Sequence, residues 1–278
     1  MNDPIQALRD AGYHVVTDRP VSKRLNAFVK LTMMQQEYYR DPLIVRLLSN
    51  AQLRKGNALT ADQLIRAVKP GENSERFIKA ATAISKAIFQ RGYSLECPDC
   101  GMVDWYPLYD MIINSSGAPL YHFVCRGFTH PFPLPINAQI EYKLNPLVSE
   151  AVKDGGLTLL NALVYLNQEV HPSERFQDKF IAVEVKNRHL HTDIDLIRFH
   201  KNGGYYVECK DNFNTTDEAI AELQRTIETG LMLANTLGYQ YVFATLQEEV
   251  PPTIQQQLDA ANARLLTAHD LLKPYDEQ

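Results

Sequence analysis

Three acidic residues and one lysine lie on either side of a short turn in the C-terminal half of the chain. Asp193 and Asp195 precede the Asn-Gly pair at 202–203, and Glu208 and Lys210 follow it. Asn-Gly supplies the positive φ angles of tight hairpin turns, so the two apolar runs that flank it predict antiparallel strands. With 202–203 as the loop, Asp195 is expected to face Lys210 and to lie diagonal to Glu208. All four polar side chains then share one face of a sheet.

Carboxylates gathered on one face are costly unless a positive charge lies between them. Divalent cations such as Mg2+ and Mn2+ prefer oxygen ligands, so this face is a candidate metal site. Asp195 and Glu208 are the expected ligands, and Asp193 is a possible accessory ligand or hydrogen-bond partner. The alternative is a solvated hairpin whose acids pair with Lys210.

The spacing Asp-x12-Glu-x-Lys, with apolar residues around both acids, resembles the PD-(D/E)XK nuclease superfamily. In that superfamily the second core strand carries Asp and the third carries (Asp/Glu)-x-Lys. The matching positions are Asp195, Glu208 and Lys210, and the resemblance covers roughly residues 150 to 247. It implies a phosphodiester hydrolase in which Asp195, Glu208 and the backbone carbonyl of Cys209 hold Mg2+ or Mn2+. Lys210 would orient the attacking water or help to deprotonate it.

One position departs from the superfamily pattern. Relatives often carry Gly-x-aromatic-Leu-Glu in a helix ahead of the core strands, with the Glu pointing into the metal site. Here Gly155-Gly156 open a predicted helix over Leu157–Asn167, and the best match to that Glu is Asn161. A neutral amide can still ligate a metal or orient water, but it lowers the negative charge of the site. A catalytically decayed nuclease core is therefore an alternative interpretation.

A second group of candidate ligands is formed by cysteine and histidine. Cys97-Pro98-Asp99-Cys100-Gly101 is a knuckle that lets two thiolates converge on one tetrahedral ion, and Cys125 and His130 offer a second pair. With two predicted strands between the pairs, the arrangement resembles a zinc ribbon in which His130 stands in place of a fourth Cys. His122 competes for that fourth position. A disulfide between Cys97 and Cys100 is the other alternative, disfavoured in a reducing compartment.

Element spacing predicts an α/β chain with three parts. Residues 1–92 are expected to form a helical N-terminal domain and residues 93–135 a zinc-ribbon-like module. A proline-rich linker over 133–153 leads to a restriction-endonuclease-like mixed-sheet domain over 150–278. Its predicted order is helix, strand, hairpin, helix, strand, helix. The predicted elements include helices over Ser74–Arg91, Asp217–Thr236 and Thr253–Leu266 and strands over Tyr13–Val16, Phe180–Lys186 and Tyr239–Ala244.

Charge is unevenly distributed along the chain. Residues 1–96 hold 15 Lys and Arg against 9 Asp and Glu, and the remainder holds 13 against 24. Clustered cations favour nucleic-acid binding through counterion release, so the N-terminal part is the better candidate for phosphate contacts. An ordinary basic helical domain explains the excess equally well. Without an apolar run of about 18 residues or a signal-peptide pattern, we expect a cytoplasmic protein that makes no membrane contact.

Together these features predict a metal-dependent endonuclease that cuts nucleic acid, with DNA favoured over RNA and phage defence or DNA processing as the setting. The hairpin is similar to nuclease domains of CRISPR-associated effectors. The first alternative is a decayed nuclease fold that acts as a nucleic-acid-binding or complex-assembly module. The second is a transposase-like or recombination protein that cuts only within a complex. A homodimer or a partner protein is the expected assembly.

Overall fold

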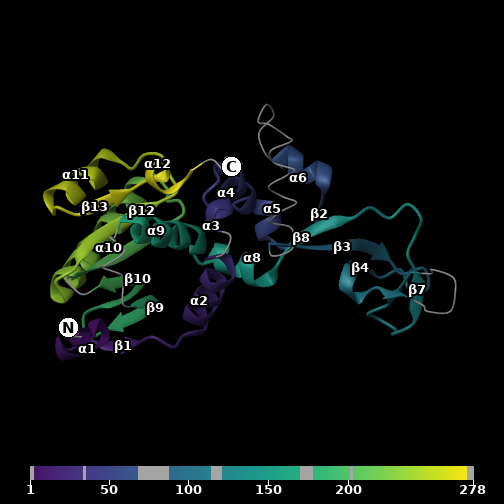
Figure 1. The fold of residues 1–278 in the computed structure, drawn as a ribbon, viewed down its shortest axis with the longest axis horizontal. Coiled ribbons are helices and arrows are strands. Elements are labelled where there is room, and N and C mark those ends of the chain that lie inside the picture. Colours follow the sequence, from purple (N-terminus) through teal and green to yellow (C-terminus); the bar gives the residue numbers. More distant parts are fainter. Residues whose placement is uncertain are drawn as a thin grey trace. The chain divides into compact units, whose positions relative to one another are not determined.

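The computed structural model describes residues 3–33, 36–67, 88–113, 121–169, 178–200 and 203–273. It is a mixed α/β fold, which confirms the predicted class (Figure 1). The chain divides into two compact units, unit 1 over Met1–Pro42 and Glu150–Gln278, and unit 2 over Leu43–Ser149. The helical domain expected over residues 1–92 is therefore wrong as a unit. Its first 42 residues belong to unit 1, because β1 (His14–Val16) pairs with β9 (Asp178–Lys186).

Unit 1 is built on a six-stranded mixed sheet in the order β1-β9-β10-β11-β12-β13. The first four strands are antiparallel neighbours, and the last two add in parallel. The predicted strands in this unit are confirmed, but the helix predicted through Leu266 ends at Ala260 and is followed by a short strand. The strands not yet bounded are β10 (His191–His200), β11 (Gly203–Lys210), β12 (Gln240–Thr245) and β13 (Arg264–Leu266).

Two long helices of unit 1 cover the strands that carry the candidate site. α9 (Gly156–Glu169) and α10 (Asp217–Leu237) both contact β11 and β12. α10 begins where the Thr216 side chain accepts from the Ala219 amide and ends at Gly238 in the left-handed conformation. The other helices of the unit are α1 (Pro4–Asp10), α2 (Pro20–Thr32), α3 (Gln36–Tyr39), α11 (Pro252–Ala260) and α12 (Ala268–Leu271). None of the helices in the described ranges has the length and apolar character that crossing a bilayer requires.

The β10–β11 hairpin is confirmed, but its predicted register is wrong. His200 pairs with Gly203 and Leu196 with Val207, so positions 201 and 202 lie between the paired residues and outside the described ranges. Gly203 is a strand residue and cannot also serve as a loop residue. Continued by one residue, the pairing sets Asp195 level with Glu208 rather than with Lys210. A shift of two residues leaves every side chain on its predicted face, because alternation along a strand has period two.

Unit 2 holds two small antiparallel sheets, in the orders β2-β8-β3-β4 and β5-β6-β7. The helix predicted over Ser74–Arg91 lies largely outside the described residues, and its last residues instead begin β3 (Phe89–Glu96). The linker predicted over 133–153 is also wrong. It contains β8 (Glu141–Leu144), which pairs with both β2 and β3, and α8 (Pro146–Lys153). The remaining elements are α4 (Pro42–Leu48), α5 (Ala51–Arg54), β2 (Leu59–Thr60), α6 (Ala61–Ala67), β4 (Val103–Pro107), a 3-10 turn (Leu108–Asp110), β5 (Ile112–Ile113), β6 (Tyr121–Val124) and β7 (Pro131–Pro133).

Candidate functional site

The structure brings Asp195, Glu208 and Lys210 together between β10 and β11. Lys210 Nζ lies 2.7 Å from Glu208 Oε1, and the backbone N–H of Cys209 donates to Asp195 Oδ2 at 2.7 Å. The Glu208 side chain is only 5% exposed, whereas Lys210 and Asp195 are partly exposed. Solvent therefore reaches this group at Asp195 and Lys210 but not at Glu208.

Burial and mutual repulsion make the two carboxylates hard to ionise. Burial raises the pKa of Glu208 to about 8, and the neighbouring charge of Asp195 adds to the shift while Lys210 opposes it. Burial likewise raises the pKa of Asp195. Burial alone would lower the pKa of Lys210, but the two carboxylates outweigh it and raise that pKa. Two acids and one lysine leave one negative charge without a partner, which a proton or a bound cation must offset.

Cys209 and Asp193 have different surroundings from the three central residues. The Cys209 thiol is buried, and burial raises its pKa well above the ordinary value, so it is core packing rather than a nucleophile. The Asp193 side chain is half exposed and lies against Arg19 instead of beside Asp195. Among the described residues, no three carboxylates of this region have oxygens within 4.8 Å of one another. The accessory role of Asp193 therefore stays a prediction.

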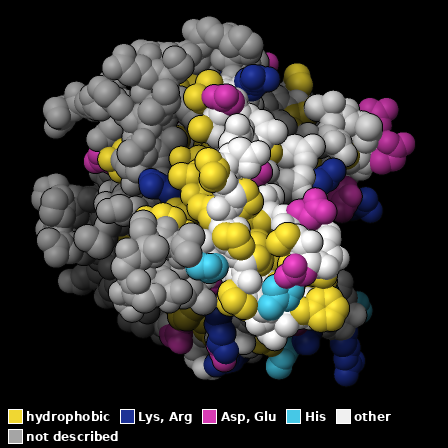
Figure 2. All heavy atoms as spheres, turned by 90° about the vertical axis from the view of Figure 1, so that its right-hand side faces the viewer, with side chains coloured by type: hydrophobic (Ala, Val, Ile, Leu, Met, Phe, Trp, Pro, Cys, Tyr) yellow, Lys and Arg dark blue, Asp and Glu magenta, His cyan; other side chains and the backbone are white. Residues whose placement is uncertain are grey.

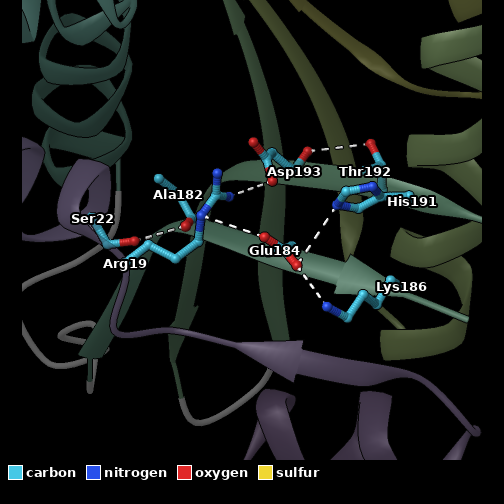
Figure 3. Close-up of polar contacts among 8 residues, drawn as sticks. All are labelled: Arg19, Ser22, Ala182, Glu184, Lys186, His191, Thr192 and Asp193. Atoms are coloured by element: carbon cyan, nitrogen blue, oxygen red, sulfur yellow. Dashed lines mark hydrogen bonds and ion pairs between the residues drawn. The ribbon is translucent and has the colours of Figure 1, made fainter.

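The backbone is deformed opposite Asp195. The β9–β10 pairing runs through Ile194 with Val183 and Leu196 with Ile181 and omits the pair between them. The omitted residue on β9 is Ala182, whose φ of 51° lies in the left-handed region that an L side chain rarely adopts. Its carbonyl accepts a hydrogen bond from Ser22 Oγ at 2.8 Å, as Figure 3 shows. No residue type in this stretch marks the deformation in advance.

A second set of charged residues continues from Asp193 across β10 and β9 (Figure 3). Glu184 pairs level with Asp193, so two carboxylates face each other across the ladder. Arg19 forms an ion pair with Asp193, and its Nε lies 3.6 Å from Glu184 Oε2. Lys186 Nζ lies 3.2 Å and His191 Nε2 3.6 Å from Glu184 Oε1, and the hydrogen bond from Lys186 lowers the pKa of Glu184. The sequence analysis missed Glu184 and Arg19, which only the strand pairing connects to the hairpin.

The residue after Lys210 ties the site to α9. Asp211 Oδ1 accepts hydrogen bonds from Thr158 Oγ1 at 2.6 Å and from the Thr158 amide at 3.3 Å. Thr158 lies in the first turn of α9, where backbone N–H groups lack partners within the helix. A carboxylate is stabilised there by both the amide and the helix dipole. This contact fixes the end of β11 against the start of α9.

Asn161 is fully buried on α9 and serves packing between helices. Its Nδ2 donates to the carbonyl of Tyr39 at 3.1 Å and to the carbonyl of Leu157 at 2.8 Å. Its Oδ1 has no hydrogen-bond partner among the described residues. An accessory role in metal or water binding, which stays a prediction, therefore depends on this oxygen alone.

Cys97, Cys100 and Cys125 form a group in unit 2 that can hold a metal ion such as zinc. Cys100 Sγ lies 3.5 Å from Cys125 Sγ, and Cys97 Sγ lies 3.1 Å from His130 Nε2. Two thiolates on one tetrahedral zinc are separated by about 3.7 Å, given Zn–S bonds of about 2.3 Å. The three thiols are thus close to the spacing that the ion requires, whereas His130 is grouped with Cys97 and Asp99 rather than with all three cysteines. Soft sulfur with imidazole is a donor set suited to zinc.

The two knuckles repeat one backbone pattern. In the first, the Gly101 amide donates to the Cys97 carbonyl at 2.8 Å; in the second, the Thr129 amide donates to the Cys125 carbonyl at 2.8 Å. Gly101 and Thr129 both have left-handed φ angles, 69° and 58°. In the second knuckle the amide of Phe128 lowers the pKa of the Cys125 thiol. Amide donors of this kind stabilise a thiolate, so the turns are compatible with metal binding, and Cys97, Cys100 and Cys125 are free thiols.

The Cys-rich part of unit 2 has a small core and a strongly apolar surface. Its buried cluster contains six residues, two of which are the candidate ligands Cys97 and Cys125. Large apolar side chains are exposed, including Val103 at 66%, Tyr109 at 73% and Phe128 at 70%. Figure 2 shows apolar side chains gathered on the face of the molecule that the Cys-rich part of unit 2 forms. A core this small gains from additional stabilisation, which a metal held by the cysteines would supply.

No protein-family model and no curated protein matches the chain. Among solved structures, the protein VC1899 from Vibrio cholerae is similar, with a TM-score of 0.48 and 11% identity over 96% of this chain and 58% of that one. Can2 from Sulfobacillus thermosulfidooxidans, solved in complex with cyclic tetra-adenylate, has a TM-score of 0.41 and 12% identity over 96% and 59%. The chain spans less than two thirds of either length. Because both scores lie below 0.5, we base the function on the site alone.

The raised pKa of Glu208 predicts a pH dependence of stability. An unfolded Glu has a pKa of about 4.3, so the folded protein binds this proton more tightly, and the stabilisation is lost as pH rises toward 8. We expect the unfolding temperature measured without Mg2+ or Mn2+ to fall between pH 5 and pH 8. The fall should be shallower in Glu208→Gln. Glu150→Gln, which removes an exposed carboxylate, is the control, and parallel curves for all three proteins would contradict the assignment.

Proposed function

We propose that unit 1 is a metal-dependent nuclease that hydrolyses phosphodiester bonds. The observation that carries this proposal is the acid pair of the partly exposed Asp195 and the buried Glu208, with Lys210 against Glu208 at the end of β11. A fold does not hold an uncompensated buried charge without a cause, and a bound divalent cation is the cause that oxygen ligands favour. The match to the Asp-x12-Glu-x-Lys pattern supports the same conclusion from the sequence.

Each residue of the group has a distinct role in this proposal. When bound, Mg2+ or Mn2+ would supply Lewis-acid chemistry toward the phosphate and the attacking water. Asp195 and Glu208 ionise to hold the ion, and the Cys209 amide keeps the Asp195 carboxylate in place. Lys210 has a raised pKa and is therefore an ammonium group. That form orients water and stabilises developing negative charge on the phosphate, but it does not take up a proton.

DNA is favoured over RNA as the substrate, and phage defence or DNA processing stays the predicted setting. The second candidate function is a decayed nuclease fold that binds nucleic acid or assembles a complex. The observation that favours it is Asn161, whose amide is engaged with the carbonyls of Tyr39 and Leu157 and which replaces the acid expected in α9. Metal-dependent cleavage separates the two functions.

The decisive assay is cleavage of supercoiled plasmid, single-stranded DNA and RNA with Mg2+ or Mn2+. We expect cutting that requires the metal and that falls at least about 100-fold in Asp195→Ala and Lys210→Ala, because each removes a group that acts on the reacting atoms. Glu222→Ala, which removes an exposed carboxylate from α10, should cut like the unaltered protein. Equal cutting by all variants would point to a contaminating nuclease. Absence of cutting with intact nucleic-acid binding would favour the decayed fold.

We further propose that the donor group in unit 2 is a closed structural zinc site with His130 as its fourth ligand. His130 lies against Cys97, whereas His122 belongs to none of the metal-capable groups found among the described residues. The exposed carboxylate of Asp99 lies 2.8 Å from the same Nε2 atom and must move away when that nitrogen binds zinc. Four protein ligands leave no open position, so this ion would stabilise the fold and take no part in catalysis.

Zinc content tests this assignment. The purified protein should hold about one zinc per chain, because a site with four protein ligands binds the ion tightly. His130→Ala should weaken zinc binding at least about tenfold, since even the loss of a supporting residue has an effect of that size. His122→Ala, a matched imidazole in the same module, should keep the ion. Metal analysis and competition with a chelator give both values, and the reverse result for the two histidines would overturn the assignment.

A further inference from the structure

Arg19 is held beside the candidate catalytic group by contacts of residues that precede it and follow it in the sequence. Three residues earlier, Val16 pairs with Glu184 at the edge of the sheet. Three residues later, the buried Ser22 donates to the carbonyl of Ala182, the residue opposite Asp195. The backbone at Arg19 is extended and leads directly into α2. Its guanidinium is thus placed next to β9 and β10 by the fold and does not depend on its own ion pairs for position.

The ion pairs of Arg19 use only part of its hydrogen-bonding capacity. Nη1 contacts Asp193 and Nε lies near Glu184, while Nη2 has no partner among the described residues. Glu184 also has Lys186 at 3.2 Å, so its charge is already balanced. A guanidinium offers five N–H donors in a planar fork that matches the oxygens of a phosphate. A quarter of the Arg19 side chain is exposed, which leaves that fork accessible.

Distance also favours a contact with the substrate. Asp193 and Asp195 are two residues apart on β10, which corresponds to about 7 Å along the strand. Asp193 is close enough that its charge contributes to raising the pKa of both Asp195 and Glu208. A polyanion that approaches Asp195 therefore meets the Asp193–Arg19 pair on the same side of the site. Repulsion by Asp193 must be offset there for a phosphate to come near.

We propose that Arg19 binds a phosphate of the substrate strand adjacent to the one that is cut, exchanging its contact with Asp193 for phosphate oxygens. The inference rests on the proposed nuclease function and names a residue outside the Asp-Glu-Lys pattern. Arg19 would act as a binding and positioning group and would not contact the reacting atoms. An alternative role is neutralising Asp193 and Glu184, but partly exposed ion pairs of this kind contribute little to stability.

The test is binding of a labelled 20-nucleotide single strand and the matching duplex DNA to the full chain, without Mg2+ or Mn2+, across 50–200 mM salt. Arg19→Gln should weaken binding about tenfold and reduce the slope of log K against log salt by about 0.7 to 0.9, the loss of one phosphate contact. Arg19→Lys should keep the slope but recover only part of the affinity. The matched control is Arg24→Gln in α2, the helix that follows Arg19. It breaks an ion pair with Asp154 and should change neither value.

A double variant separates phosphate binding from charge balance. If Arg19→Gln acts only by exposing the charge of Asp193, adding Asp193→Asn will restore binding, and the proposal is wrong. If Arg19 contacts phosphate, the double variant keeps the reduced salt slope. If the protein binds DNA but does not cut it, the nuclease function is wrong, while the effect of Arg19→Gln on binding still stands. A protein that cuts with an unchanged slope in Arg19→Gln overturns the role of Arg19 alone, and absence of all binding overturns both.

Discussion

The candidate site of unit 1 depends on one electrostatic constraint, a buried carboxylate, Glu208, beside the partly exposed Asp195 with a single lysine. Glu208 is almost fully buried, Asp195 follows the last paired residues of the hairpin beside it, and Lys210 neutralises only one of the two charges. The folded protein needs either a proton or a bound cation at this group, because otherwise one carboxylate charge stays uncompensated. In the proposed function this requirement would give the site its affinity for a positive ion and would link metal binding to proton release.

The surrounding elements hold this group with hydrogen bonds from the backbone and from neighbouring helices. The Cys209 amide fixes Asp195, Asp211 joins the end of β11 to α9 through Thr158, and Ser22 holds α2 against the deformed backbone at Ala182. These contacts come from segments far apart in the sequence. The site therefore requires the whole of unit 1, including residues 1–42, and not the hairpin alone.

Local patterns predicted the elements that local physics determines. The Asn-Gly pair identified the hairpin, the predicted helix over Asp217–Thr236 matches α10 to within one residue, and the cysteine spacing identified both knuckles. The register was wrong because the strand pattern fits pairings that differ by two residues equally well. The contact of Arg19 with Asp193 joins residues 174 apart, and no local pattern predicts such a pairing. The same holds for β8, which lies in a proline-rich stretch and becomes a strand only by pairing with β2 and β3.

The division of the chain was also decided by long-range contacts. Hydrophobic periodicity indicates helices in residues 1–42 but not the partner on which they pack. The pairing of β1 with β9 and the contacts of α2 with β9 assign this segment to unit 1. Asn161 illustrates the same limit at a single residue. Its type suggested a replaced ligand, which stays a prediction, and its burial and its bond to Tyr39, which only the fold reveals, show that it also joins two helices.

The most direct test of the central claim is calorimetric titration of Mn2+ into the protein at pH 7 in two buffers of different ionisation enthalpy. Because Glu208 has a pKa of about 8 without a cation, binding should release about one proton per ion. Asp195→Ala should abolish the binding signal. Binding without proton release, or the same binding in Asp195→Ala, would contradict the claim that Asp195 and the buried Glu208 form the cation site.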